Sequence, residues 1–282
     1  MNGTDPGLLA DMAASSADRL AAARTRESER DLLRRAENTP PAPPLRLSPE
    51  RFDIIAECKL RSPSAGDLSQ ATASTDARVA AYARGGACAV SVLTEPTRFG
   101  GVLSHLADAA RALAPLATPV MRKDFLIDPY QVMEARTAGA GGVLLIARML
   151  DRERLGAMLD CAAALGLFVL LEAFDAADLA LMQDALNTRT SSGVILVGLN
   201  CRDLDTLAID VTRFAALREH MPHGRPWVAE SGIVSDEDAS TAAELGYELA
   251  LVGSALMGAR EPEYMLSSML AAGRRASSRR GA

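Results

Sequence analysis

Eight short apolar runs occupy most of this sequence, and a segment with helical patterning follows each of them. Most of the runs are rich in Val, Ile and Leu and nearly continuous, which is typical of strands buried on both faces. Strands are predicted at 53–57, 87–93, 119–122, 142–146, 167–171, 194–199, 226–229 and 249–252. Helices are predicted at 75–84, 103–112, 129–138, 152–165, 176–184, 211–220, 236–245 and 261–272. A strand–helix alternation repeated eight times predicts that the strands are parallel.

This alternation favours a closed α/β fold, the (β/α)8 or TIM barrel, over residues 46–272. The full length of 282 residues is close to the usual size of one such barrel. An open, doubly wound sheet is the alternative, but no Gly-rich dinucleotide fingerprint follows the first run. Glycines that directly follow predicted helices are expected to cap them in the left-handed conformation; they are Gly86, Gly139, Gly166 and Gly246.

The two ends of the chain differ from the middle. Residues 11–37 are rich in Ala, Leu, Arg and Glu and read as helix, and the proline-rich stretch 39–44 ends it. Residues 1–45 are therefore predicted to be an N-terminal helical arm that packs across the barrel. Residues 273–282, rich in Arg and Ser, are predicted to be a flexible tail.

Composition excludes several classes of protein. A formal net charge of −6 and a pI of about 5.2 argue against a general nucleic-acid binder, whose surface is usually basic. The four cysteines form no CxxC pair and residues 1–10 do not resemble a signal peptide, so a soluble cytoplasmic protein with reduced thiols is expected. The three histidines have no metal-site spacing, and no apolar stretch reaches the roughly 18 to 20 residues of a membrane span. No metal, cofactor, nucleic-acid or membrane partner is predicted.

Charged and polar residues follow directly after several of the apolar runs. In this fold, catalysis takes place at the carboxyl ends of the strands. Alternate strands contribute side chains to one layer, and residues two apart on a strand point to the same side. Convergence near the barrel axis is therefore expected for Glu57, Lys59, Lys123, Glu172 and Glu230, with Asn200 and Arg202 on one strand beside them.

Such a cluster of carboxylates and ammonium groups should be strongly coupled, so that the pKa values of its members move apart. One group can then act as an acid while another acts as a base. Asp124 is assigned a different role, to brace a loop, and the role of Glu95 is left open.

Two Gly-Ser pairs indicate a phosphate site. Ser231-Gly232 follows the seventh strand and Gly253-Ser254 follows the eighth. The loops after these two strands hold a phosphate in many barrels, because glycine lets backbone N–H groups approach the oxygens and serine adds a donor. The segment around Ser62, after the first strand, is predicted to be a mobile loop over the substrate.

In combination, these motifs resemble the indole-3-glycerol phosphate synthase family of tryptophan biosynthesis. They run in order from about residue 50 to 260, each at its expected strand, and an extra N-terminal helix also fits this family. The matching stretches are Ile55–Lys59 with Ser62–Ser64, Leu93–Glu95 with Phe99–Gly101, Arg122–Phe125, Leu144–Ile146, Glu172, Gly198–Leu204, Ala229–Ile233 and Val252–Met257.

The resemblance implies a cofactor-free lyase. It would close the indole ring of 1-(2-carboxyphenylamino)-1-deoxyribulose 5-phosphate with loss of carbon dioxide and water. Lys123 resembles the general acid, Glu172 the later general acid or base, and Lys59 the lysine that holds the substrate carboxylate. The resemblance further implies an orienting shell of Glu57, Asn200 and Arg202 near Glu230, ring contacts from Phe99 and Phe125, and a phosphate site of Ser62, Ser231, Gly232, Gly253 and Ser254. Leu251 is predicted to contact the substrate as well. A monomer or weak homo-oligomer is expected.

The sequence departs from the family pattern in three places. Ala173-Phe174 follow Glu172 where valine and histidine are more usual, the stretch Gly139–Gly142 reads Gly-Ala-Gly-Gly where an Ala-Asp pair is usual, and Leu60 replaces a basic residue. No presumed catalytic group is lost. The departures favour, as an alternative, a paralogue that acts on a modified substrate in a specialised pathway.

Two further readings stay open. Phosphoribosylanthranilate isomerase is another phosphate-binding barrel and would use an Asp–Cys pair, for which Cys58 is available, although the two lysines fit it poorly. A non-catalytic barrel that binds a phosphorylated ligand is the other, and the presence of Lys59, Lys123 and Glu172 argues against it.

Overall fold

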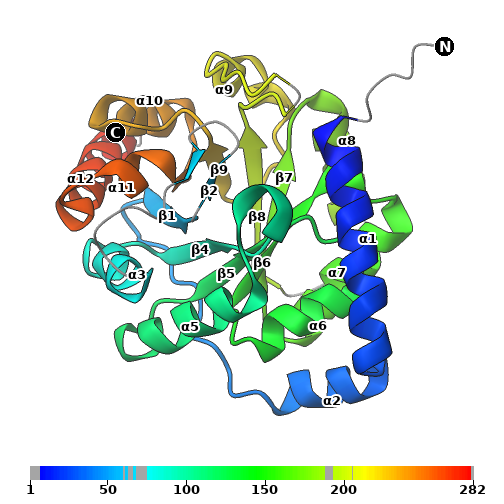
Figure 1. Cartoon of the computed structure of the whole chain (residues 1–282). Helices are drawn as coiled ribbons and strands as arrows, with labels where there is room; N and C mark the ends of the chain where they lie inside the picture. Colours follow the sequence, from blue (N-terminus) through cyan, green and yellow to red (C-terminus); the bar gives the residue numbers. More distant parts are fainter. Residues whose placement is uncertain are drawn as a thin grey trace.

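The chain folds as a closed barrel of eight parallel strands (Figure 1). A computed structural model describes residues 7–59, 75–187, 193–204 and 206–280, with the backbone alone of 61–62 and 66–67. The strands, in order around the barrel, are β1 (Asp53–Cys58), β4 (Ala89–Leu93), β5 (Val120–Lys123), β6 (Gly142–Ile146), β7 (Phe168–Ala173), β8 (Ile195–Asn200), β9 (Trp227–Glu230) and β10 (Leu249–Val252), which pairs with β1 again. The predicted fold class and strand positions are confirmed.

Helices separate consecutive strands and cover the outside of the barrel. The long ones are α3 (Thr75–Arg84), α5 (Leu103–Leu113), α6 (Pro129–Thr137), α7 (Arg152–Ala164), α8 (Ala176–Asn187), α10 (Asp236–Leu245) and α12 (Pro262–Arg280). Three short helices lie at strand ends, namely α4 (Pro96–Phe99), α9 (Arg213–Ala216) and α11 (Ser254–Gly258). A small antiparallel pair, β2 (Arg61–Ser62) with β3 (Gly66–Asp67), follows β1. The predicted glycine caps are confirmed, for example at Gly246, where φ is +105°.

The core has two layers, because the side chains of each buried strand alternate between the barrel interior and the surrounding helices. Outward-facing residues such as Val143 and Val197 pack against the helices. Inward-facing residues such as Ile55, Leu170 and Leu196 are fully buried along the barrel axis. Apolar side chains thus fill the barrel below the carboxyl ends of the strands, the ends at which catalysis takes place in this fold.

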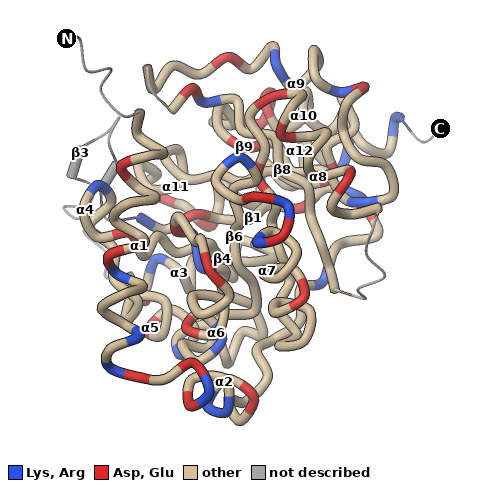
Figure 2. The backbone as a smooth tube through the Cα atoms, turned by 90° about the vertical axis from the view of Figure 1, so that its right-hand side faces the viewer, with Lys and Arg blue, Asp and Glu red and all other residues tan. Residues whose placement is uncertain are grey.

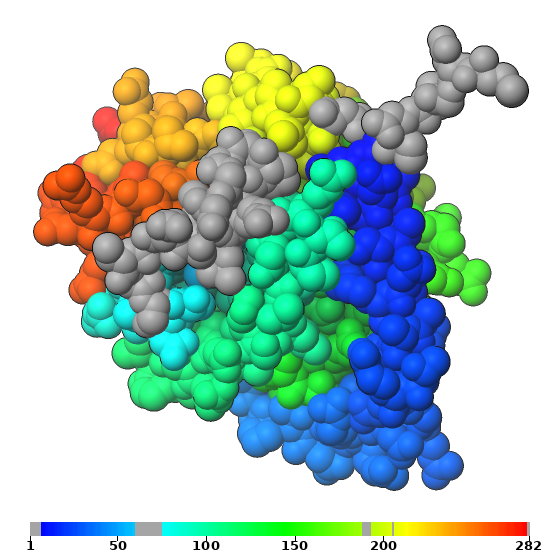
Figure 3. All heavy atoms as spheres, in the orientation of Figure 1, coloured from blue at the N-terminus to red at the C-terminus, as the bar shows by residue number. Residues whose placement is uncertain are grey.

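The N-terminal arm consists of two helices, not the single helix expected over 11–37. Helix α1 (Leu8–Arg26) ends before Ser28, whose hydroxyl accepts a hydrogen bond from Asp31 N and begins α2 (Glu29–Asn38). Helix α1, dark blue in Figure 3, lies flush against the barrel. Its buried residues Met12, Leu20 and Ala23 face the barrel. Charges of both signs gather on α2 at the lower end of the molecule (Figure 2).

Two local predictions are wrong. Residues 273–280, expected to be a flexible tail, continue α12, because Ala276 and Ser277 are buried and Arg274 forms an ion pair with Asp53. The helix expected over 211–220 is only the short α9 followed by a 3-10 turn at Arg218–His220. Phe214 is the one buried residue of these two elements, so little packing stabilises a longer helix here. Over the part of the chain described, no helix is both long enough and apolar enough to span a bilayer.

Candidate active site

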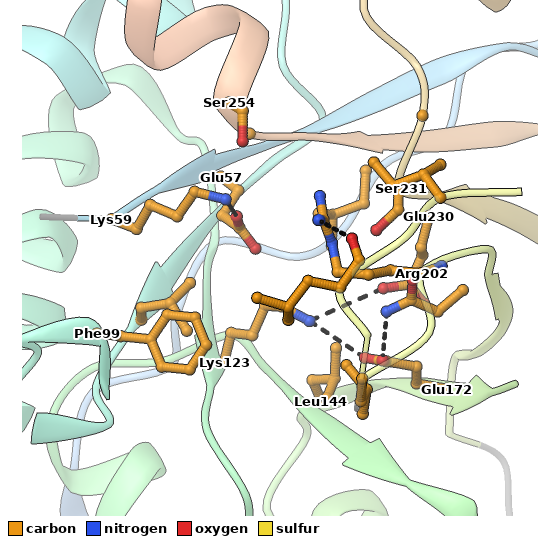
Figure 4. Close-up of a pocket in the computed structure, with 18 of the residues that line it drawn as sticks. Glu57, Lys59, Phe99, Lys123, Leu144, Glu172, Arg202, Glu230, Ser231 and Ser254 are labelled. Carbon is orange, nitrogen blue, oxygen red and sulfur yellow. Dashed lines mark hydrogen bonds and ion pairs between the residues drawn. The ribbon is translucent and has the colours of Figure 1, made fainter. Parts of the chain in front are cut away.

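The charged strand ends converge on one pocket at the top of the barrel (Figure 4). Lys123 Nζ lies 3.1 Å from Glu172 Oε2 and 3.9 Å from Glu230 Oε2. Lys59 Nζ lies 2.7 Å from Glu57 Oε1 on another wall. All five side chains line the pocket, which confirms their predicted convergence.

The strand that follows Glu172 adds a polar partner to this cluster. Asn200 Nδ2 donates to Glu172 Oε1 at 2.7 Å, and Asn200 Oδ1 accepts from the backbone N–H of Arg202 at 3.0 Å. Glu172 is therefore held between an amide and an ammonium group. Arg202 also lines the pocket, and burial lowers the pKa of its guanidinium.

The pKa values of the clustered groups move apart, as predicted. Burial alone would raise the pKa of Glu57, but Lys59 and Lys123 outweigh it and lower that pKa below its usual value. Burial and the charge of Glu172 raise the pKa of Glu230 well above its usual value, against the opposing effect of Lys123. Burial would lower the pKa of Lys123, but Glu172, Glu230 and Glu57 raise it. The pocket thus favours a charged Glu57, a charged Lys123 and a protonated Glu230.

Gly198 makes room for the Glu230 carboxyl group. A Cβ atom at residue 198 would lie 1.9 Å from Glu230 Oε1, closer than any two such atoms can approach. Both Glu230 oxygens are buried without a conventional hydrogen-bond partner among the described residues. Gly198 was not singled out from the sequence, because its role depends on a contact with the neighbouring strand.

The substitution Gly198→Ala is expected to lower kcat/KM by about 100-fold, because a displacement of about 1 Å at a reacting group has that order of effect. The added methyl group must displace the Glu230 carboxyl group, whose other oxygen lies 3.9 Å from Lys123 Nζ. Steady-state kinetics would measure the loss. Gly258→Ala is the matched control, since no atom lies within 4 Å of a Cβ there. An equal effect of both substitutions would contradict this role for Gly198.

Apolar side chains form the opposite wall of the pocket. The rings of Phe99 and Phe125 have centroids 6.1 Å apart, and Leu251 lines the pocket on β10, between β1 and β9. Leu8, at the start of α1, also lines the pocket and was not predicted. A flat aromatic ring fits a wall of this composition.

The two Gly-Ser loops lie on one side of the pocket. Ser231 and Gly232 have φ values of +66° and +88°, so two successive left-handed residues turn the chain at the end of β9. Gly253 passes so close to the Glu57–Lys59 pair that a Cβ there would lie 2.5 Å from Glu57 Oε1. Ser231, Gly232, Gly253 and Ser254 all line the pocket. The side chain of Ser62 lies outside the described residues.

Asp124 braces the loop after β5, as predicted. Its carboxylate is buried and accepts hydrogen bonds from Arg19, Thr94, Arg122 and the backbone N–H of Phe125. Burial would raise the pKa of Asp124, but Arg122 and Arg19 lower it to about 2. Glu95, whose role was left open, caps α4 by accepting from three backbone N–H groups. Asp124 therefore fixes the backbone directly after Lys123, and Glu95 fixes the backbone at Phe99.

The substitution Arg19→Met is expected to lower the free energy of unfolding by about 2 kcal/mol, the usual cost of losing hydrogen bonds to a charged partner. Arg19 is the arm's bidentate contact to Asp124, with both N–O distances at 2.8 Å. Urea unfolding would measure the change. Arg34→Met, which breaks an exposed pair with Asp31, is the control and should cost less than about 0.5 kcal/mol. Equal losses in both variants would show that Arg19 does not anchor the arm.

One compositional signal of this site was missed. The 30 basic residues of the chain comprise 28 arginines and two lysines, and both lysines, Lys59 and Lys123, line the pocket. Arginine cannot replace lysine where a compact ammonium donor is needed. Because every other Lys or Arg position in the chain is arginine, the two lysines stand out as candidate site residues.

One departure from the family pattern, Ala173-Phe174, follows Glu172 directly at the end of β7. Phe174 is buried under the Arg148 guanidinium, 4.8 Å from the ring centroid, and its backbone N–H donates to Asp178. Neither Ala173 nor Phe174 lines the pocket. The change next to Glu172 therefore alters the packing behind the site.

Cys58 lies on the outward side of β1, in the layer between strands and helices. Burial raises the pKa of its thiol to about 11, so it is a poor acid or base at neutral pH. This position argues against the isomerase reading. Within the described residues, no group of three or more potential ligands is placed to hold a metal ion.

Comparisons with known proteins agree with this geometry. The family model for indole-3-glycerol phosphate synthase matches residues 9–269. The indole-3-glycerol phosphate synthase of a Parafrankia species is 42% identical over 228 residues, which are 80% of this chain and 81% of that protein. The protein of the same name from a Nocardioides species is 44% identical over 211 residues, covering 74% and 76%.

Solved structures support the fold alone. The 3-hexulose-6-phosphate synthase of Salmonella typhimurium superposes with a TM-score of 0.58 at 15% identity, over 81% of this chain and 99% of that one. Sequence, pocket and relatives together lead to one assignment. The chain belongs to the indole-3-glycerol phosphate synthase family.

Proposed function

We propose that this protein converts 1-(2-carboxyphenylamino)-1-deoxyribulose 5-phosphate to indole-3-glycerol phosphate, as a carboxy-lyase of tryptophan biosynthesis. The observation that carries the proposal is the Lys123–Glu172 pair, with its N–O distance of 3.1 Å, beside an aromatic wall. Ring closure needs a proton donor at a carbonyl oxygen, and this pair supplies a donor with a base beside it. No metal or organic cofactor is required.

In the first step, the Lys123 ammonium group donates a proton to the substrate carbonyl oxygen. The ring carbon that bears the carboxylate then bonds to the carbonyl carbon, and the carboxylate leaves as carbon dioxide. Lys59, paired with Glu57, would hold that carboxylate beforehand, together with Arg202. The mixture of charged and apolar lining supports this division, because a leaving carboxylate and an aromatic ring need different surroundings.

In the second step, the new hydroxyl group leaves as water while a ring proton is removed. Glu172 would take or return a proton, and its hydrogen bonds to both Lys123 and Asn200 support this role. The raised pKa of Glu230 supports a role as a proton reservoir beside this pair. Proton transfers of this kind each contribute about 10²–10⁴-fold to the rate.

The substrate phosphate would lie at the Ser231–Gly232 and Gly253–Ser254 loops. Their backbone turns and hydroxyl groups lie on one side of the pocket, across from the phenylalanine rings. We further propose a cytoplasmic enzyme that works as a monomer or weak homo-oligomer without nucleic-acid partners. The free thiols of Cys58, Cys88, Cys161 and Cys201 are in keeping with that compartment.

The test is to incubate the purified protein with the carboxyphenylamino-deoxyribulose phosphate and to follow indole fluorescence. Turnover with release of one carbon dioxide per indole is expected. Tight binding without turnover would support the non-catalytic reading instead. Preference for a ring-substituted substrate over the unsubstituted one would support the specialised paralogue.

A further inference from the structure

Arg78 is a buried arginine that lies outside the pocket and contacts α11, the helix at the edge of the pocket. It lies on α3, its exposed fraction is 7%, and Nη1 donates to the carbonyl oxygens of Leu256 and Met257, both at 3.2 Å. One turn further along α3, the Tyr82 hydroxyl group donates to Met257 Sδ at 3.4 Å. Helix α3 therefore contacts the end of α11 at two points.

Helix α11 depends on such contacts for its position. It has five residues, and isolated helices of fewer than about 12 residues are marginal in water. The last carbonyl groups of a helix have no partner within it, and a cation there is favourable. Arg78 supplies both the donors and the charge.

The guanidinium group of Arg78 has no competing ion pair with any carboxylate of the described residues. A buried cation without a counter-ion is costly unless it is hydrogen-bonded. Among the described residues, the carbonyl groups of α11 and the neighbouring Tyr82 hydroxyl group compensate for its burial. A displacement of α11 would lose the carbonyl contacts, so Arg78 and α11 hold each other in place.

The other end of α11 is the pocket wall. Ser254 is its first residue, and Gly253 before it passes against the Glu57–Lys59 pair. A small shift of α11 would change the distance of both residues from Lys59. Because Gly253 and Ser254 are the proposed phosphate contacts, such a shift would change how the phosphate fits against this wall.

We propose that Arg78 is a positioning residue for the phosphate end of the substrate, acting through α11. This inference rests on the proposed function, because it takes Gly253 and Ser254 as phosphate contacts. It assigns no contact between Arg78 and the substrate. Its effect should appear in binding, since the groups that carry out the chemistry lie on other strands.

The variant Arg78→Met is expected to raise KM, and the inhibition constant of inorganic phosphate, about tenfold, which corresponds to the loss of one charge-assisted hydrogen bond. The value of kcat should change by less than about twofold, because uniform binding is lost. Arg78→Lys keeps the charge and one donor, and should recover part of the affinity. Arg84→Met, on the same helix in an exposed pair with Glu263, is the control and should leave all three constants unchanged.

The outcomes separate the possibilities. An unchanged KM and phosphate inhibition constant in Arg78→Met would overturn the inference, as would a fall in kcat and melting temperature with KM unchanged. If Arg78→Met does not fold, Arg78→Lys decides, with an intermediate KM expected and a wild-type KM contradicting the role. Failure of the wild-type protein to turn over its substrate would instead refute the proposed function, and inhibitor binding could still be measured by calorimetry.

Discussion

Replacement of Lys123 by alanine is expected to lower kcat by about 1,000-fold, within the range for loss of a general acid and of charge stabilisation at the reacting oxygen. Lys123 is the ammonium group that lies between Glu172 and Glu230. Without it, the reacting carbonyl oxygen loses its ammonium donor, although Asn200 still bonds to Glu172. The loops at Ser231 and Gly253 stay intact, so the affinity for inorganic phosphate should hardly change.

Indole fluorescence under saturating substrate measures kcat, and competition by inorganic phosphate measures the binding of the anion. Lys123→Arg is the informative companion, because arginine keeps the positive charge but holds its proton too tightly to act as an acid. We expect it to remain inactive as well. Full activity of Lys123→Ala would show that another group donates the proton, and activity of Lys123→Arg alone would show that charge suffices.

The second large effect is expected for Glu172→Gln, with a fall in kcat of about 100-fold or more. Glutamine keeps the shape of the side chain and can still bond to Asn200, but it cannot accept a proton. The loss should therefore fall on the proton-transfer steps, while KM stays near that of the wild type. Glu219→Gln, on an exposed turn, is the matched control and should have no effect.

Glu172→Gln should also shift the pKa values of neighbouring groups in a defined direction. The charge of Glu172 raises the pKa of Glu230 and that of Lys123. Its removal should lower both values, and the pH profile of the residual activity should move to lower pH. A shift to higher pH would contradict the arrangement of charges described for the pocket.

The sequence predicted the strand ends well because charged residues follow the apolar runs where the strands reach the pocket. Glu57, Lys123, Glu172 and Glu230 could be found in this way, and the spacing of two between Asn200 and Arg202 placed them on one side. Their convergence followed from the geometry of the barrel, without knowledge of individual contacts.

The features that were missed depend on partners distant in the sequence. Gly198 matters only because Glu230, on the next strand, occupies the space that a Cβ would need. Leu8 joins the pocket only because the arm folds back over the barrel, with Arg19 reaching Asp124 across 105 residues. The C-terminal residues 273–280 look polar, yet their alanines and serines pack on the barrel in α12. None of these contacts can be predicted from the composition of the surrounding sequence.

The restriction of lysine to the pocket has a practical outcome for labelling. Reagents that acylate or reductively alkylate primary amines would find only Lys59 and Lys123 among the side chains, besides the N-terminal amine. Their side chains are 11% and 18% exposed, so a bound ligand should shield them. The extent of acylation at these two side chains, read by mass spectrometry, would therefore report pocket occupancy directly, because arginine side chains carry no primary amine.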